Sequence, residues 1–422
     1  MYPVVMLELD CSQEFDASRD TDFFATLPSR PAVFLLEMAD ASARPYLAKA
    51  ADLRRAAQRL LLPPEMPSQR LNLRGVAARI RYRLTGSKFE QTLALYQHVR
   101  AHFPHRYRDL LRLRPPAVLK LNLRNEYPRC YATRRIHADG SFYFGPFPSR
   151  RAAEAFGESF LDLFKMRRCQ IKIRRDPQFP GCIYSEMKMC LAPCFASCTK
   201  DEYDAEVGRV LEALATAGAA LTEKMECERE AASEALDFEL AAALHKRLEK
   251  ASLVLRGLPE LPRRIEALDA VVLQRAGEKK TIVLFPIRAG ILSEPIFLRF
   301  GELSSQPRSV EAILRAELDP TAKIDTHSAG TEHTLNADAE NCRIPTGSAG
   351  EHRRRYGLHT ASVELPEHLS LIARWFYSKP REGEIFFREA EWPYRRILRA
   401  CSRLLAPAAV PQSGRKASPP QS

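Results

Sequence analysis

Five cysteines gathered between residues 169 and 198 are the residues whose chemistry is most evident in this sequence. Four of them follow the spacing C-x12-C-x7-C-x3-C: Cys169, Cys182, Cys190 and Cys194. Four thiolates can hold a tetrahedral zinc ion or an iron–sulfur cluster. Zinc knuckles carry two close cysteine pairs and this sequence has one, so spacing alone leaves zinc and a cluster equally open. The simpler alternative is a set of reduced thiols without metal.

The segment Cys190-Leu-Ala-Pro-Cys194 favours a metal centre, because a proline between two cysteines shapes a tight loop and interrupts a helix. The first residues lack the basic start and long apolar stretch of a signal peptide. No apolar run approaches the ~18 residues that cross a bilayer. We therefore expect a cytoplasmic protein with reduced thiols, not a secreted disulfide scaffold or a membrane protein.

Positive charge is concentrated in one part of the chain. The whole sequence carries a formal charge of +12, and residues 70–135 contain sixteen basic and three acidic residues. A basic field of this size suits a polyanion, because phosphate binding releases counterions. Nucleic acid is the expected partner, and a solubilising arginine-rich face is the alternative.

The length of 422 residues predicts two to four domains, and a hydrophobic fraction of 45% is ordinary for a soluble globular protein. The mixture of expected strands and helices predicts an α/β multidomain fold. Alternation, turn and capping signals place the elements along the chain. Strands are expected at 31–36, 44–48, 117–123, 129–136, 141–144, 268–274, 281–287 and 291–300. Helices are expected at 53–62 after an Asp52 cap, 89–100, 149–164, 201–255 with a break near 217–218, 366–377 and 393–405. Residues 318–351 are expected to form a long loop, and 406–422 a disordered tail.

Several segments together resemble the UvrC subunit of the bacterial UvrABC excision-repair nuclease, over about residues 28–300. The run Arg134–Ser149, RRIHADGSFYFGPFPS, is similar to that family's strand–turn–strand, and MKMCLAPC at 187–194 to its cysteine signature. The resemblance implies that Cys169, Cys182, Cys190 and Cys194 hold a 4Fe–4S cluster, with zinc as the alternative.

Residues 232–255, with the run LDFELAA from Leu236, look like the family's UVR motif, a helical hairpin that binds UvrB. The resemblance implies a partner surface on Leu236, Phe238, Leu240 and Leu244. Leucines repeat here every four residues, so hairpin packing accounts for some of them, and Phe238 lies off that stripe.

The family begins with a GIY-YIG nuclease domain, and residues 22–110 look like a worn copy of it. Tyr46 and Lys49 remain as vestiges of the site, while Phe34 and Ala48 stand where a tyrosine and a glycine belong. In this register Ala56 stands at the position of the catalytic arginine, with Arg55 and Arg59 close by.

Leu95 stands at the position of the metal-binding glutamate, and Glu90 is the nearby carboxylate. Without that carboxylate the site has little reason to hold Mg²⁺. The family's RNase H-like domain is expected to be absent, since residues 352–405 contain no aspartate.

These features predict five parts: a degenerate GIY-YIG-like domain at 22–110, a β-hairpin with the cysteine-rich segment at 111–200, a UVR hairpin at 201–256, a β-rich remnant at 263–405, and the tail. DNA contacts are expected at Lys49, Arg55, Arg59, Arg134 and Arg135. The leading hypothesis is an excision-repair protein that binds DNA and UvrB without incision. The alternatives are a nuclease rearranged around Tyr46, Arg55 and Glu90, and a redox-sensing DNA-binding protein.

Overall fold

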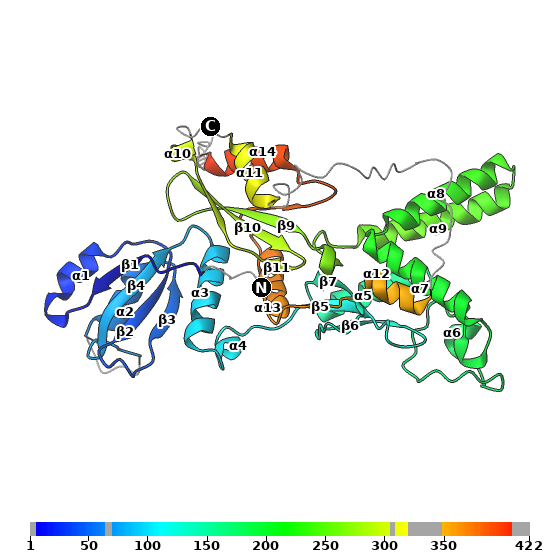
Figure 1. Cartoon of the computed structure of the whole chain (residues 1–422), viewed down its shortest axis with the longest axis horizontal. Coiled ribbons are helices and arrows are strands. Elements are labelled where there is room, and N and C mark those ends of the chain that lie inside the picture. Colours follow the sequence, from blue (N-terminus) through cyan, green and yellow to red (C-terminus); the bar gives the residue numbers. More distant parts are fainter. Residues whose placement is uncertain (1–5, 64–69, 304–308, 320–347, 407–422) are drawn as a thin grey trace, which may run out of the picture.

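Three antiparallel sheets follow one another along the long axis of the molecule (Figure 1). The computed structural model describes residues 6–63, 70–303, 309–319 and 348–406. Most of the expected loop at 318–351 and nearly all of the expected tail lie outside these residues. Within the described ranges, no helix combines the length and the apolar character needed to cross a membrane.

The first sheet has the strand order β1-β4-β2-β3. Its strands are β1 (Cys11–Glu14), β4 (Ala77–Leu84), β2 (Ala32–Met38) and β3 (Tyr46–Ala50), and its helices are η1 (Ala17–Arg19), α1 (Asp20–Thr26), α2 (Leu53–Leu61) and α3 (Lys88–His102). The expected strands at 31–36 and 44–48 are confirmed, as is the Asp52 cap, which accepts a hydrogen bond from the amide of Arg55. Strand β2 is buried on both faces: Phe34 packs towards α2, and Val33 towards α3.

The second sheet has the order β6-β5-β7-β8. It consists of β6 (Cys130–Thr133), β5 (Ala117–Leu121), β7 (Phe142–Phe147) and β8 (Arg263–Arg264), and short helix α4 (Tyr107–Leu110) precedes it. The expected β-hairpin does not form between the strands predicted at 129–136 and 141–144, because β6 and β7 lie on either side of β5. Helices α5 (Arg150–Leu161) and α7 (Lys200–Ala215) cover one face through Phe160 and Tyr203.

The cysteine-rich segment joins α5 to α7 and contains the short helices α6 (Ile183–Glu186) and η2 (Pro193–Phe195). After α7 the chain forms α8 (Ala219–Glu234) and α9 (Phe238–Arg256), which project together from one end of the molecule (Figure 1). The break expected near 217–218 is confirmed. A second break, not expected, lies at Leu236, whose φ of 61° ends α8, and Asp237 then caps α9.

The third sheet confirms the expected meander. It contains β9 (Ala270–Arg275), β10 (Thr281–Arg288), β11 (Ile291–Leu292), β12 (Ile296–Arg299) and β13 (Glu384–Phe387), after the turn η3 (Ile265–Ala267). Helix α13 (Leu365–Phe376) lies on one face, and α11 (Val310–Leu318) and α14 (Tyr394–Leu405) lie on the other. Two further helices are α10 (Phe300–Leu303) and α12 (Ala349–Tyr356).

A single hydrophobic core joins the first sheet to the meander. Helix α3 lies between them, and the rings of Phe89 on α3 and Phe285 on β10 are 5.0 Å apart. Beside this core, Glu367 on α13 accepts hydrogen bonds from the hydroxyls of Tyr96 at 2.7 Å and Tyr107 at 2.6 Å, and from Nε of Arg108 at 2.7 Å. These contacts fix α3 and α4 against the carboxyl-terminal part of the chain.

Candidate nucleic-acid interface and cysteine-rich segment

Tyr46 and Lys49, which the sequence predicts to be vestiges of a nuclease site, face opposite sides of the first sheet. Successive side chains of a strand alternate between its faces. Tyr46 packs on the side of α2, where its ring is 6.2 Å from that of Phe34. Lys49 lies beside α3, with Nζ 3.3 Å from Oγ1 of Thr92. Burial lowers the pKa of Lys49, and the nearby Arg374 and Lys88 lower it further.

Glu90, the carboxylate that the sequence predicts beside the nuclease-like site, has a structural role. Glu90 is buried at the start of α3, where it accepts a hydrogen bond from the amide of Gly86 at 2.8 Å and lies 3.6 Å from Nε of Arg83. Burial raises its pKa. Arg55 is exposed on α2, on the other side of the sheet, next to Asp52 at 3.6 Å. The structure therefore does not bring Tyr46, Arg55 and Glu90 together.

Much of the positive charge in residues 70–135 is already paired. Several of its acidic partners come from distant parts of the chain: Glu14 lies 3.0 Å from Arg79, and Glu367 lies 2.7 Å from Arg108. The paired basic residues are Arg74, Arg79, Arg81, Arg83, Lys88, Arg100, Arg108 and Lys120. The count of charges along the sequence thus overstates the field that this region presents to solvent.

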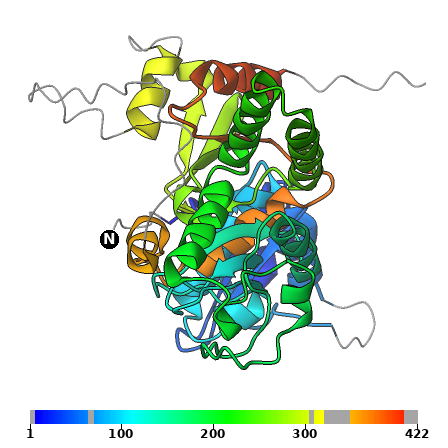
Figure 2. The same cartoon turned by 90° about the vertical axis from the view of Figure 1, so that its right-hand side faces the viewer.

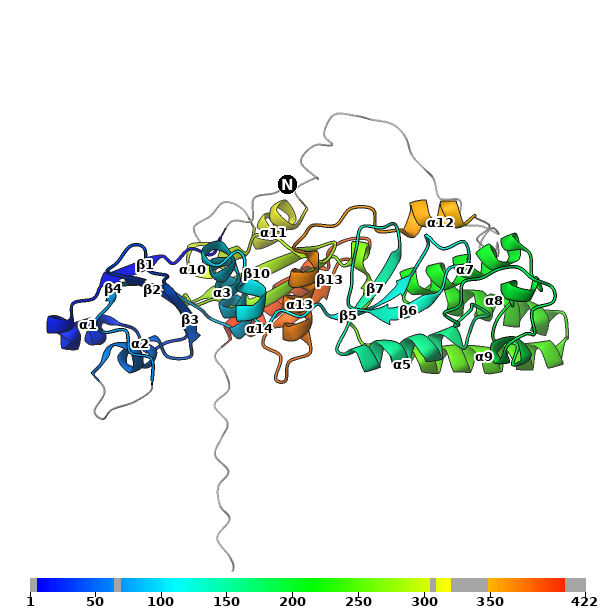
Figure 3. The same ribbon diagram turned by 90° about the horizontal axis from the view of Figure 1, so that it is seen from below.

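The predicted DNA-binding residues fall into two separate groups. Lys49, Arg55 and Arg59 belong to the first sheet and its helix α2. Arg134 and Arg135 are exposed in the turn between β6 and β7 of the second sheet. Figure 3 shows these two sheets at a distance from each other, with the meander between them. The structure does not gather the five residues on one surface.

The four predicted metal ligands lie on one irregular segment. Cys194 is buried and the other three are half-buried. Burial raises the pKa of Cys190 to about 11; the amide of Ala192 donates to its Sγ at 3.3 Å, and the thiols of Cys169, Cys182 and Cys194 are near enough to add to the rise. Among the residues that the structure describes, no three His, Cys, Asp or Glu side chains are arranged to hold a metal ion.

A buried arginine that sequence reasoning missed organises the start of this segment. Arg167 is 5% exposed, and no carboxylate among the described residues forms an ion pair with it. Its Nε donates to the carbonyl of Tyr127 at 2.8 Å, and Nη1 donates to the carbonyl of Ile171 at 2.9 Å. The same Nη1 lies 3.7 Å from Sγ of Cys169. The next residue, Arg168, instead pairs with Asp162 at 2.7 Å.

The α8–α9 hairpin carries an apolar surface at its turn. Leu236, Phe238 and Leu240 are 71%, 67% and 49% exposed. Leu244, one helical turn further along α9, is 7% exposed, so it does not belong to the exposed surface. The leucine repeat therefore divides between hairpin packing and an exposed end.

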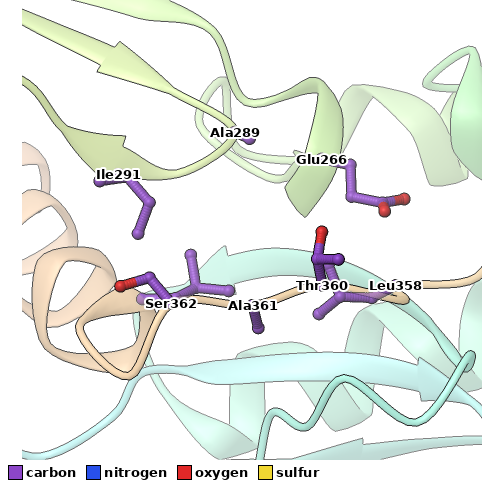
Figure 4. Close-up of a pocket in the computed structure, with 8 residues that line it drawn as sticks. Glu266, Ala289, Ile291, Leu358, Thr360, Ala361 and Ser362 are labelled. Atoms are coloured by element: carbon purple, nitrogen blue, oxygen red, sulfur yellow. The ribbon is translucent and has the colours of Figure 1, made fainter. Parts of the chain in front are cut away.

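The described residues also form an open pocket of about 510 Å³ between the meander and residues 358–365 (Figure 4). Its lining is mainly aliphatic, and its polar side chains are Glu266, Thr360 and Ser362. Glu266 is already paired with Arg264. The pocket therefore has no pair of free catalytic groups.

Comparison with known proteins places the second sheet and α7 in one family. Residues 117–213 match the middle domain of the UvrC/Cho excinucleases. The chain is 32% identical over 269 residues to the UvrABC system protein C of Oleidesulfovibrio alaskensis, which covers 63% of this chain and 38% of that protein. The corresponding proteins of Dehalococcoides mccartyi and Carboxydothermus hydrogenoformans are 27% and 29% identical, over 68% and 66% of this chain and 47% and 46% of their own lengths.

The chain spans less than half the length of these curated relatives. No solved structure matches it. The cysteine-rich segment and most of the second sheet lie inside the matched region, whereas the first sheet, α8, α9 and the meander lie outside it. By its middle domain and by these relatives, the chain is similar to the UvrC proteins.

Proposed function

We propose that this chain acts in nucleotide excision repair as a protein that binds DNA and a UvrB-like partner without cutting DNA. Its similarity to proteins named UvrABC system protein C supports a role in repair. The observation that carries the proposal is the apolar surface of Leu236, Phe238 and Leu240 on the projecting α8–α9 hairpin. Aromatic and leucine side chains exposed together are typical of a protein-binding anchor.

Binding to purified UvrB tests the partner assignment. Changing Phe238→Ser together with Leu240→Ser removes two of the three exposed apolar groups and leaves the buried Leu244 and Leu248 in place. We expect a loss of at least 10-fold in affinity, since anchor residues contribute about 2 kcal/mol or more. The control is Leu253→Ser on the same helix, where Leu253 is 70% exposed but 13 positions further along. Equal losses in both variants would contradict the proposal.

We propose the absence of incision because of the residues that occupy the positions required by the nuclease reaction. Hydrolysis in this family needs a phenol, an arginine and a metal-binding carboxylate on one site. Here Ala56 and Leu95 occupy two of those positions, on helices that cover opposite faces of the sheet. Glu90 is buried and committed to Gly86 and Arg83.

We propose further that Cys169, Cys182, Cys190 and Cys194 hold a 4Fe–4S cluster, with zinc as the alternative. Such a centre carries net negative charge on its thiolates, and hydrogen bonds to sulfur are typical of its surroundings. The amide of Ala192 directed at Cys190 and the uncompensated guanidinium of Arg167 beside Cys169 fit that chemistry. Bringing the four sulfurs together requires the loop to close further than in the structure.

Anaerobic purification with iron, sulfide and zinc analysis tests the metal proposal. We expect about four irons per chain, lost in Cys169→Ser and in Cys190→Ser. Cys227→Ser is the control, because Cys227 is exposed on α8, away from the segment. A chain without bound metal under these conditions would contradict the proposal.

A further inference from the structure

Helix α12 comes from the carboxyl-terminal third of the chain but lies on the second sheet, next to α7 (Figures 2 and 3). Nε2 of His352 is 3.0 Å from the carbonyl of Asp204 on α7, and both residues are buried. Tyr356 is 6% exposed and packs against Phe142 of β7, with ring centroids 6.4 Å apart. These two side chains hold α12 in a defined position.

The backbone after α12 is hydrogen-bonded to the turn between β6 and β7. The amide of Gly140 donates to the carbonyl of Leu358 at 2.8 Å, and the amide of Leu358 donates to the carbonyl of Ser141 at 2.9 Å. A Cβ on Gly357 would lie 2.4 Å from the carbonyl oxygen of Gly140. The helix and the end of the turn at residues 139–141 therefore approach as closely as backbone allows, and we treat the helix and the turn together as one surface.

This joint surface is rich in arginine. Arg353 lies over Gly140, with Nη2 3.5 Å from the carbonyl of Asp139. Arg354 and Arg355 are exposed at the end of the same helix. Arg134 and Arg135 enter the turn from β6 and are exposed as well. We call these five residues the α12–turn surface.

The carboxylates near the α12–turn surface are already engaged. Asp139 lies 2.6 Å from Nζ of Lys120, and Glu351 accepts from the amide of Ser348 at 2.6 Å in the cap of α12. Within the described ranges, none of the five arginines forms an ion pair. Their charge is thus presented to solvent, in contrast to the paired arginines of β4.

We infer that the α12–turn surface is a binding site for the phosphate backbone of nucleic acid. Guanidinium groups bind phosphate through two parallel hydrogen bonds, and the planar fork of each group is pre-organised for that geometry. Three of the five arginines come from a helix outside the region 117–213 that matches the UvrC/Cho middle domain. The inference rests on the proposed DNA-binding function and adds a surface to it.

Fluorescence anisotropy with a labelled DNA duplex, measured over a series of salt concentrations, tests this inference. In the variant Arg353→Gln, Arg354→Gln, Arg355→Gln we expect affinity near physiological salt to fall roughly 10-fold or more, equally for unrelated sequences. The slope of log affinity against log salt should fall by about one for each phosphate that the variant no longer neutralises. Arg134→Gln with Arg135→Gln should act in the same direction.

The matched control removes the same charge elsewhere: Arg395→Gln, Arg396→Gln and Arg399→Gln, all exposed on α14. Equal effects of the two triple variants would overturn the inference in favour of a general effect of net charge. An unchanged salt slope in the α12 variant would overturn it in favour of another partner for this surface. If the unaltered protein fails to bind DNA, both the inference and the DNA-binding part of the proposed function are wrong. Unfolding temperatures of both triple variants verify that the fold is retained.

Discussion

Tyr46 and Lys49, three residues apart on β3, lie on opposite faces of the same sheet. A catalytic site that used both would need their side chains on one face. The phenol of Tyr46 lies instead among apolar groups next to Phe34, and the ammonium of Lys49 lies next to Thr92. The role of each side chain can therefore be tested by a single substitution.

We expect no nicking of supercoiled DNA by this protein in the presence of Mg²⁺ or Mn²⁺. If a trace is seen, Tyr46→Phe and Glu90→Gln should leave it unchanged, because the two residues lie apart and Glu90 is occupied by Gly86 and Arg83. Gel electrophoresis of the plasmid measures the product. Nicking that depends on metal and disappears in both variants would establish the rearranged nuclease instead.

Glu367 should make the stability of the protein depend on pH. Burial by itself would raise the pKa of this carboxyl, but hydrogen bonds from Tyr107, Tyr96 and Arg108 outweigh it, and the pKa is lowered from 4.5. The ionised form is thus favoured in the folded state. Its contribution is present above the ordinary carboxyl pKa and is lost as the pH falls through the lowered value.

In Glu367→Gln we expect unfolding to become easier by about 2 kcal/mol or more at neutral pH, because hydrogen bonds to a charged group are removed. The difference from the unaltered protein should shrink below about pH 4, the ordinary range of a carboxyl pKa, as measured by urea unfolding. Glu14→Gln is the control, since the Glu14 side chain is 82% exposed beside Arg79. A difference that stays constant with pH would contradict the assignment.

Gly357 should be needed for the docking of α12. Its φ of −78° suits any residue, so the effect of Gly357→Ala is steric: the new Cβ would meet the carbonyl of Gly140. Such overpacking costs about 1–3 kcal/mol. We expect faster hydrogen exchange at the amides of Gly140 and Leu358.

The matched control for that experiment is Gly350→Ala on the same helix. A Cβ there has only Oγ of Ser348 nearby, at 3.7 Å. Alanine favours a helix over glycine by about 0.5–1 kcal/mol. Hydrogen exchange at Gly140 and Leu358 should therefore slow or stay unchanged in Gly350→Ala. Equal acceleration in Gly357→Ala and Gly350→Ala would contradict the close approach of α12 to the turn.

Substitutions of the neighbouring residues Arg167 and Arg168 should have very different effects on stability and on metal content. Arg167→Met removes the donor to the carbonyl of the buried Tyr127, which costs about 1–3 kcal/mol, and the donor to the carbonyl of Ile171. It also removes the positive charge beside Cys169. Arg168→Met removes one pair with Asp162. We expect the first variant alone to unfold at a lower temperature and to retain less metal. Similar behaviour of the two variants would show that Arg167 has no special part in the segment.

Local signals predicted much of the fold. The start of α2 was predicted from its Asp52 cap and its end from the prolines at 63–64, and the start of α14 was predicted at Pro393. These signals are reliable because the end of a helix depends on a few neighbouring residues. Strand β4 was missed although Arg79, Arg81 and Arg83 alternate with apolar residues. Strand β13 gave a weaker signal, and its position depends on pairing with β9, more than 100 residues away.

The site residues were also harder to predict, because their surroundings depend on residues far away in the sequence. The charge of β4 is balanced by Glu14 and Glu37, which a count within one window leaves out. Helix α12 is almost wholly polar, and its position depends on His352 and Tyr356 contacting residues of the second sheet and α7. Only the three-dimensional contacts bring Arg353 to the turn that follows Arg134 and Arg135.

The shared core of α3 also constrains how this chain can change over time. Phe89 and Tyr96 belong to a core that includes residues of the first sheet, the meander and α13. Removing residues 22–110 would therefore remove the side chains that cover the interior of the remaining molecule. A substitution at a position outside this core, such as Lys49, leaves the shared interior in place. Deletion of the whole domain would instead expose apolar surface of the meander and α13 to solvent.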